Sequence, residues 1–310
     1  MMAVFTKLKK SEIEEFLISY DIGKLEKFNE IVEGIENTNY KLICGGDPYI
    51  LTIFEKRVNE KDLPFFMDLK LYLNQKNFKC PKPIVNNHNK IINSLKEKKA
   101  VVISFIDGKK IKTPNSNDCL EIGRILGELH NISKGFNKKI ENSLNLSALK
   151  KIFLKCFDSN HLKFKELFKE INNEINFLEN SWPINLPSGI IHADLFKDNV
   201  FFEDGKISGV IDFYFSCYHF FLYDIAIVIN DWCFQDNGNK FNNQHFNSII
   251  KGYSLSRELN NNETNSFNII LRVATIRIII TRLHDYIFHP NDAVVEKKDP
   301  FEYYNILKWH

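Results

Sequence analysis

The chain has 310 residues, which is too long for one small core and predicts two domains or one two-lobed enzyme. Its hydrophobic content of 44% and charged content of 26% are those of a globular protein. A formal net charge of +2 excludes the strongly basic surface typical of nucleic-acid binders, so we expect no nucleic-acid partner.

The cysteines and the apolar stretches indicate the compartment. Six cysteines are scattered along the chain without a C-x-x-C pair, which predicts reduced, buried thiols rather than disulfides or a zinc site. The first residues form a charged amphipathic pattern instead of an apolar signal segment. The apolar stretch at residues 272–283 is too short and too rich in arginine to span a bilayer. We therefore expect a soluble, cytoplasmic protein that does not contact a membrane.

Strand and turn patterns follow an amphipathic first helix. Residues 24–44 predict two strands around a turn, and period-2 alternation predicts a third strand over 48–56. Apolar residues at helical spacing predict a helix over 59–77, and two prolines brace an extended segment at 80–85. A further strand is predicted over 99–108. This part of the chain should therefore form a small antiparallel sheet with one main inserted helix.

From residue 116 onward the pattern is mostly helical. Helices are predicted over residues 116–133, 147–158, 161–180, 221–232, 241–257 and 264–288. The exception is a β-hairpin signal at Asp204-Gly205, which stands between two apolar runs.

The order of these elements predicts an α+β protein with two lobes. We expect a small β-rich N-terminal lobe over residues 1–103, a hinge over 104–110 and a larger helical C-terminal lobe over 111–310. Clefts between lobes are where small ligands usually bind.

Polar residues interrupt the apolar stretch 190–217, "IIHADLFKDNVFFEDGKISGVIDFYFSC". Asp194 follows a short strand, Asn199 precedes the next strand, and Asp212 stands at the far end of the returning strand. Pairing around the Asp204-Gly205 turn should bring Asp212 beside Asn199. Burying an unpaired carboxylate costs roughly several kcal/mol, so we expect these residues to have a function. The alternative is that these are turn and cap residues satisfied by the backbone.

Such a group of oxygen-bearing side chains suits phosphoryl transfer. Mg²⁺ prefers carboxylate, amide and phosphate oxygens, and a separate carboxylate must accept the proton of the attacking hydroxyl. A D-x-x-x-x-N loop followed by a metal-binding Asp is the arrangement found in kinases.

The motifs "HADLFKDN" and "IDF" resemble the catalytic loop and the metal-binding motif of aminoglycoside-phosphotransferase-type kinases. The resemblance implies a two-lobed, protein-kinase-like fold that uses ATP and Mg²⁺. It implies that Asp194 is the catalytic base, that Asn199 and Asp212 hold the metal, and that His192 braces the loop by hydrogen bonding.

Further segments resemble the bacterial homoserine kinases of this fold over essentially the whole chain, among them "YILTIFEKRVNEKDLPFFMDL", "CPKPI", "TRLHDY" and "KDPFEYYNILKW". This resemblance implies transfer of the ATP γ-phosphate to the hydroxyl of L-homoserine, giving O-phospho-L-homoserine on the route to threonine. Two alternatives stay open: a kinase for choline, an aminoglycoside or a sugar, and a catalytically inactive nucleotide-binding protein. The sequence also leaves monomer and homodimer open.

The phosphate-binding residues depart from the pattern of the fold. A basic sheet residue usually contacts the α and β phosphates, but Thr52 stands at that place. Lys56 is the nearest substitute because it shares the strand face by period 2. Its other interpretation is a surface lysine at a strand end. The turn 34–40 would cover the phosphates with backbone N–H groups, and Asn37 and Asn39 suit turn conformations.

The adenine is expected against the segment that joins the lobes. Residues 103–108, "ISFIDG", would supply backbone donors and acceptors, with Ile103 and Phe105 as apolar contacts. Without the fold resemblance, this segment is merely a strand that enters a turn.

Homoserine is a zwitterion, so its site needs an arginine for the carboxylate and an acidic group for the ammonium. The candidates on the late helix are Arg277, Arg282 and Asp285, of which Arg282 in "TRLHDY" is our choice. Its other interpretation is an ion pair with Asp285 or another neighbour. Tyr214 should line the pocket if the strand continues past Asp212. Asp224 should anchor a helix start rather than touch the substrate.

Overall fold

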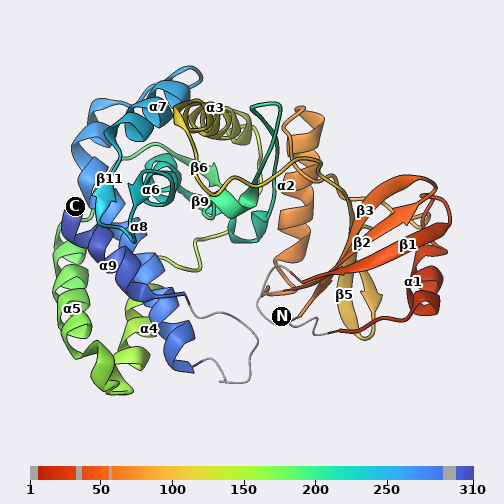
Figure 1. The fold of residues 1–310 in the computed structure, drawn as a ribbon, viewed down its shortest axis with the longest axis horizontal. Coiled ribbons are helices and arrows are strands. Elements are labelled where there is room, and N and C mark those ends of the chain that lie inside the picture. Colours follow the sequence, from red (N-terminus) through yellow and green to blue (C-terminus); the bar gives the residue numbers. More distant parts are fainter. Residues whose placement is uncertain (1–5, 33–36, 56–57, 289–297) are drawn as a thin grey trace. The chain divides into compact units, whose positions relative to one another are not determined.

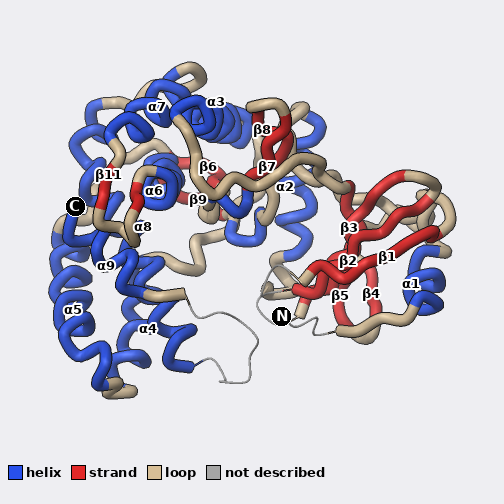
Figure 2. Tube along the Cα trace, viewed as in Figure 1, coloured by secondary structure: helices blue, strands red, loops and turns tan. Residues whose placement is uncertain are grey.

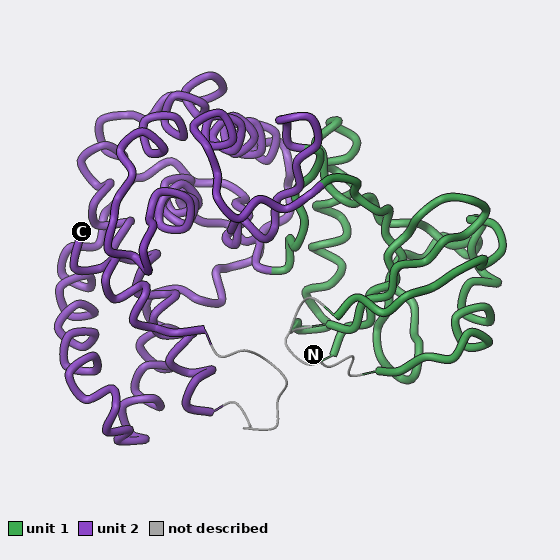
Figure 3. The backbone as a smooth tube through the Cα atoms, in the orientation of Figure 1, with its two compact units in different colours: residues 1–108, 208–214, 292–295 green, residues 109–207, 215–291, 296–310 purple. Residues whose placement is uncertain are grey.

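A computed structural model describes residues 6–32, 37–55, 58–288 and 298–310. The chain forms two compact units, which Figure 3 colours green and purple. The N-terminal unit comprises residues 1–108, 208–214 and 292–295. The C-terminal unit comprises residues 109–207, 215–291 and 296–310. Each unit is described by itself below. The domain limits predicted from the sequence stay a prediction beside this division.

The N-terminal unit is built on one antiparallel sheet of five strands, drawn as red and yellow arrows in Figure 1. Its strand order is β1-β2-β3-β5-β4. The strands are β1 (Leu25–Ile31), β2 (Asn37–Cys44), β3 (Asp47–Phe54), β4 (Asn93–Leu95) and β5 (Lys98–Ser104). The described residues of this unit also form the helices α1 (Lys10–Leu17) and α2 (Leu63–Gln75). The predicted antiparallel sheet with one main inserted helix is confirmed.

Local chemistry explains this sheet. In β2 every second residue is buried, as period-2 alternation requires of a strand with one face on the core. Gly45 and Gly46 join β2 to β3 with φ angles of 57° and 88°, a left-handed turn conformation that glycine adopts without a Cβ clash. The core beneath the sheet includes Tyr40, Leu42 and Leu51, all fully buried.

One predicted turn is shorter than the sequence indicated. The turn was expected over residues 34–40, but β2 already begins at Asn37. Asn37 and Asn39 are therefore strand residues, and Asn39 pairs directly with Thr52 of β3. Residues 33–36 lie outside the described part of the chain. Asparagine favours turns when it is considered alone, but pairing with β3 decides the conformation here.

The C-terminal unit is mainly helical, as predicted (Figure 2). Its helices are α3 (Ser116–Ser133), α4 (Leu146–Asp158), α5 (Lys165–Asn180), α6 (Phe221–Trp232), α7 (Asn243–Ser254), α8 (Asn261–Phe288) and α9 (Pro300–Trp309). The short 3₁₀ helix η1 (Leu162–Phe164) precedes α5. Asn115 caps α3 by accepting from the backbone N–H groups of Asn117 and Asp118. The sequence patterns did not indicate α9, which begins at a proline after an Asp cap.

Three two-stranded sheets complete the fold. They pair β6 (Ser188–Ile191) with β9 (Cys217–Phe220), β7 (Val200–Glu203) with β8 (Lys206–Val210), and β10 (Phe234–Gln235) with β11 (Lys240–Phe241). The predicted hairpin turn at Asp204-Gly205 joins β7 to β8, with φ angles of 48° and 71°. The condition set for Tyr214, that the returning strand continues past Asp212, is not met. β8 ends at Val210, and residues Phe213–Phe215 form the 3₁₀ helix η3.

Glycines allow helices α3 and α7 to cross closely. A Cβ atom on Gly123 would lie 2.1 Å from the carbonyl oxygen of Ile249, and one on Gly252 would lie 2.0 Å from that of Leu120. Neither contact is possible for a larger residue without moving the backbone. This approach brings Tyr253 of α7 within hydrogen-bonding distance of His130 of α3.

Candidate active site

The loop between β6 and β7 carries the predicted catalytic base, and α6 holds both ends of it. The carboxylate of Asp224 accepts the backbone N–H groups of His192 and Ala193, each at 2.8 Å. Seven residues later on α6, Asp231 accepts the backbone N–H of Lys197 at 2.8 Å. Residues seven apart lie two turns apart on one helix face, so a single face of α6 anchors the loop.

The loop has an unusual backbone at Ala193, whose φ of 61° lies in the left-handed region. This conformation is rare for a residue with a Cβ and persists only where the surroundings impose it. Here they are the Asp224 carboxylate on the N–H of Ala193 and the Arg277 guanidinium on its carbonyl oxygen. The loop is therefore held in one shape before any substrate binds.

Asp224 is itself fixed by a buried histidine. The Nε2 atom of His130 lies 3.2 Å from the Asp224 carboxylate, and its Nδ1 atom lies 2.8 Å from the Tyr253 hydroxyl. Burial lowers the pKa of His130, which leaves the ring neutral, with Nε2–H donating to Asp224. Burial opposes ionisation of Asp224, but the hydrogen bonds from His130 and the loop outweigh it and lower the pKa of Asp224.

Hydrogen bonds to three residues of the C-terminal unit, Arg277, Asn199 and His192, hold Asp194. The Arg277 guanidinium donates to its Oδ1 at 2.9 Å, and Asn199 donates to its Oδ2 at 3.2 Å and to its carbonyl oxygen at 2.8 Å. The backbone N–H of Asp194 donates to Nδ1 of His192 at 3.2 Å. The Asp194 side chain is still 16% exposed, so a hydroxyl can approach its carboxylate.

The role of Arg277 was missed from the sequence, where this arginine was considered only as a substrate ligand. Its side chain is buried and lies over the ring of Phe215, 5.2 Å from the ring centroid. The signal was an arginine in the middle of the apolar run 272–283. A buried guanidinium needs a carboxylate partner, and Asp194 supplies it.

The predicted metal ligand Asp212 belongs to the N-terminal unit, where it follows β8. Its φ of 64° is also in the left-handed region. Near it lies a residue that no sequence motif indicated, Lys70 of α2. The buried ammonium of Lys70 donates to the Tyr214 hydroxyl at 3.2 Å. Burial lowers the pKa of Lys70 to about 8, against the opposing effects of Cys80 and the Asp212 carboxylate.

The residues present fit a magnesium ion. The amide nitrogen of Asn199 donates to Asp194, which leaves the amide oxygen to serve as a metal ligand. Asp212 adds carboxylate oxygens. These are oxygen ligands of the kind that Mg²⁺ binds together with phosphate oxygens and water. Asn199 and Asp212 belong to different units, so their convergence stays a prediction.

The residues predicted to bind the nucleotide lie in the N-terminal unit. The Thr52 hydroxyl donates to the Asn39 side chain at 2.8 Å, so these two satisfy each other across the β2–β3 pair. Ile103 is buried on β5, and the ammonium of Lys41 lies 3.6 Å from the ring centroid of Phe105. Lys56 lies outside the described residues. The roles of these residues, and of Asn37, stay predictions.

The residues predicted to bind the substrate contact different partners within their own units. Arg282 donates to Glu302 of α9 at 2.6 Å and to the Asp299 carbonyl at 2.9 Å, which matches the alternative interpretation as an ion pair. Asp285 lies 3.5 Å from Nδ1 of His284. Tyr214 packs edge-on against Phe54 at a centroid distance of 5.2 Å.

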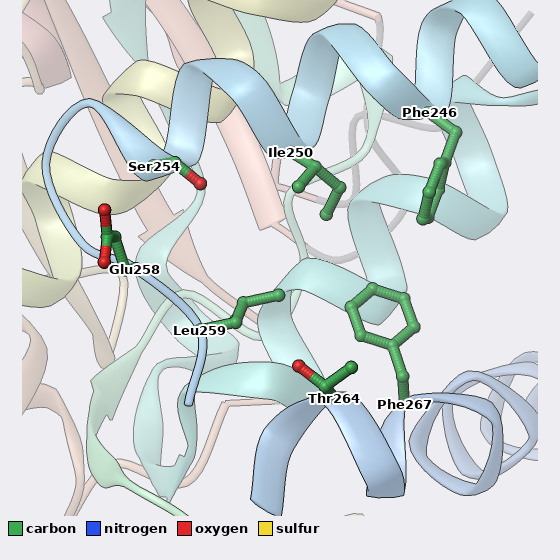
Figure 4. Close-up of a pocket in the computed structure, with 7 residues that line it drawn as sticks. All are labelled: Phe246, Ile250, Ser254, Glu258, Leu259, Thr264 and Phe267. Atoms are coloured by element: carbon green, nitrogen blue, oxygen red, sulfur yellow. The ribbon is translucent and has the colours of Figure 1, made fainter. Parts of the chain in front are cut away.

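Figure 4 shows a surface pocket of the C-terminal unit between α7 and α8. It is lined by Phe246, Ile250, Ser254, Glu258, Leu259, Thr264 and Phe267. None of the residues predicted to act in catalysis or binding lines it. Within the described residues, no helix combines the length and the apolar character that crossing a membrane requires.

An antiparallel sheet, a helical unit and an anchored Asp-x-x-x-x-Asn loop define the class of kinase-like phosphotransferases. The model of the phosphotransferase enzyme family matches residues 27–247. Homoserine kinases of Parvibaculum lavamentivorans and Agrobacterium fabrum are 40% and 39% identical over 309 residues, which cover 100% of this chain and 96% of each relative. The chain therefore belongs to the phosphotransferase family, among the homoserine kinases.

Solved structures of similar fold are more distant in sequence. An amicoumacin kinase in complex with AMP-PNP and Ca²⁺ superposes with a TM-score of 0.71 at 18% identity, covering 98% of this chain and 92% of that one. A microcompartment-associated aminopropanol kinase gives a TM-score of 0.66 at 14% identity, covering 96% and 95%. These likenesses show the two-lobed α+β kinase fold predicted from the sequence.

Proposed function

We propose that this protein transfers the γ-phosphate of ATP to the side-chain hydroxyl of L-homoserine, giving O-phospho-L-homoserine. The observation that carries the proposal is the similarity to curated homoserine kinases over the whole chain. The anchored loop around Asp194 adds the chemistry that such a reaction needs.

In this reaction Asp194 orients the hydroxyl of homoserine and accepts its proton as the oxygen attacks phosphorus. Arg277 and Asn199 prevent the carboxylate from rotating, so the hydroxyl meets it in one geometry. Mg²⁺, held by Asn199 and Asp212, would supply positive charge to the phosphates. His192 keeps the loop in place through the backbone N–H of Asp194.

The proposal is tested by following ADP release from purified protein with ATP, Mg²⁺ and one acceptor at a time. The acceptors are L-homoserine, L-serine, choline and kanamycin. We expect ADP release with homoserine well above the other three. Release with choline or kanamycin instead would keep the phosphotransferase and reject the substrate. ATP binding without release from any acceptor would favour the inactive nucleotide-binding alternative.

The assignment of Arg282 to the carboxylate of homoserine has its own test. If Arg282 binds that carboxylate, Arg282→Gln raises the KM for homoserine by about 10- to 100-fold and leaves the KM for ATP unchanged. If its ion pair with Glu302 is its whole role, only the melting temperature falls. The measurement is steady-state kinetics beside a thermal melt, with Glu302→Gln as the matched control because it breaks the same ion pair.

The remaining site assignments belong to the same proposal. Tyr214 and Asp285 are proposed to line the homoserine site, and Asn37, Asn39, Thr52, Lys56, Ile103 and Phe105 to surround ATP. A cytoplasmic location is also proposed, in keeping with a biosynthetic enzyme. Monomer and homodimer stay open.

A further inference from the structure

The N-terminal unit buries a positive charge that the proposed mechanism does not use. Lys70 is 2% exposed, and among the residues that the structure describes no other lysine is buried. Its ammonium donates to the Tyr214 hydroxyl at 3.2 Å and lies 4.5 Å from the centroid of the same ring. A neutral hydroxyl and a ring face do not balance the charge of a buried ammonium. Burying such a charge without an anion beside it costs roughly several kcal/mol.

Burial lowers the pKa of Lys70, and Cys80 and the carboxylate of Asp212, which stands two residues before Tyr214, oppose this shift. If Asp212 holds a metal ion, its charge is shared with that ion. The ammonium then faces a second cation and needs a further anion. The phosphates of a nucleotide supply it, because they bring several negative charges to the metal and the lysine together.

The resemblance to this kinase fold implies a phosphate-binding cation at one place on the sheet, and that place does not carry one here. Thr52 stands at its place, and its hydroxyl is committed to Asn39 at 2.8 Å. Lys70 comes from helix α2 instead, at a point where η3 places the Tyr214 ring beside its ammonium.

We propose that Lys70 of α2 contacts the phosphates of ATP in place of a cation at position 52 of the sheet, and that it acts beside Asp212. This inference rests on the proposed function, since it takes the site as one for ATP and Mg²⁺. It assigns the basic residue that the sequence motifs left unassigned.

The first test compares wild type, Lys70→Met and Lys76→Met. Methionine keeps the length of the buried side chain without its charge, and Lys76 is an exposed lysine at the end of the same helix. Isothermal titration with Mg·ATP and with adenosine measures binding without turnover. For Lys70→Met we expect the Kd for Mg·ATP to rise about 10- to 100-fold while the Kd for adenosine is unchanged. Lys76→Met should match wild type for both ligands.

Two outcomes of this titration overturn the inference. One is unchanged Mg·ATP binding by Lys70→Met, and the other is equal weakening for ATP and adenosine, which would show a loss of structure instead of a lost phosphate contact. The proposed function is judged separately, because only wild-type turnover with homoserine decides it. A wild type that binds Mg·ATP through Lys70 but does not phosphorylate homoserine would keep this inference and reject the substrate.

A second test uses the wild-type protein, so it does not depend on the folding of a variant. An acyl phosphate of ATP carries its acyl group beside the phosphates, and a nearby lysine amine attacks the acyl carbon, forms an amide and releases ATP. We expect peptide mass spectrometry to find the label on Lys70 and excess ATP to block it. Label on Lys56 instead would assign the phosphate contact to Lys56 and overturn the inference.

Discussion

Replacing Asp194 with Asn lowers kcat for homoserine phosphorylation by about three orders of magnitude, because the amide cannot accept the proton of the attacking hydroxyl. The fold should persist. The amide oxygen can still accept from Arg277, and Asn199 can keep the hydrogen bond that it donates to the backbone carbonyl oxygen of residue 194. The measurement is kcat from ADP release, with circular dichroism and a thermal melt to verify folding.

The matched control is Asp198→Asn, a carboxylate in the same loop. Asp198 is exposed, and its carboxylate lies 3.8 Å from the ammonium of Lys298. Because surface ion pairs contribute little to stability, we expect Asp198→Asn to change kcat by less than about twofold. A folded Asp194→Asn enzyme with kcat near that of this control would remove Asp194 from the role of base.

Replacing Asp224 with Asn destabilises the whole C-terminal unit and inactivates the enzyme. The two carboxylate oxygens accept from the backbone of His192 and Ala193 and from Nε2 of His130. In the Asn variant the amide nitrogen replaces one of these two oxygens, whichever way the amide is turned. The N–H group that donated to that oxygen is then buried without an acceptor. We expect the free energy of unfolding to fall by about 3 to 5 kcal/mol, the usual cost of breaking a buried charged network.

Urea unfolding measures this loss, and ADP release at a low urea concentration reports whether the loop is still active. Asp236→Asn is the control, since Asp236 is exposed in the turn between β10 and β11. An Asp224→Asn protein with wild-type stability and wild-type kcat would contradict the view that α6 fixes the catalytic loop.

Much of the fold was predictable because local rules decide it. Strand and turn patterns predicted the main strands of the N-terminal sheet, and an asparagine cap with helical spacing predicted α3 over Ser116–Ser133. Asp204-Gly205 gave the hairpin turn. The turn before β2 was predicted too long because pairing with β3 overrides the turn preference of asparagine.

The sequence by itself determined the class of this protein, through two aspartates and an asparagine at fixed spacing in residues 194–212 and a family resemblance over the whole chain. Only the tertiary structure decided what holds them. Arg277 reaches Asp194 across 83 residues, and Lys70 reaches Tyr214 across 144. No periodicity or short motif encodes such contacts, because they depend on which helix faces pack together. Burial then makes each charge require its partner.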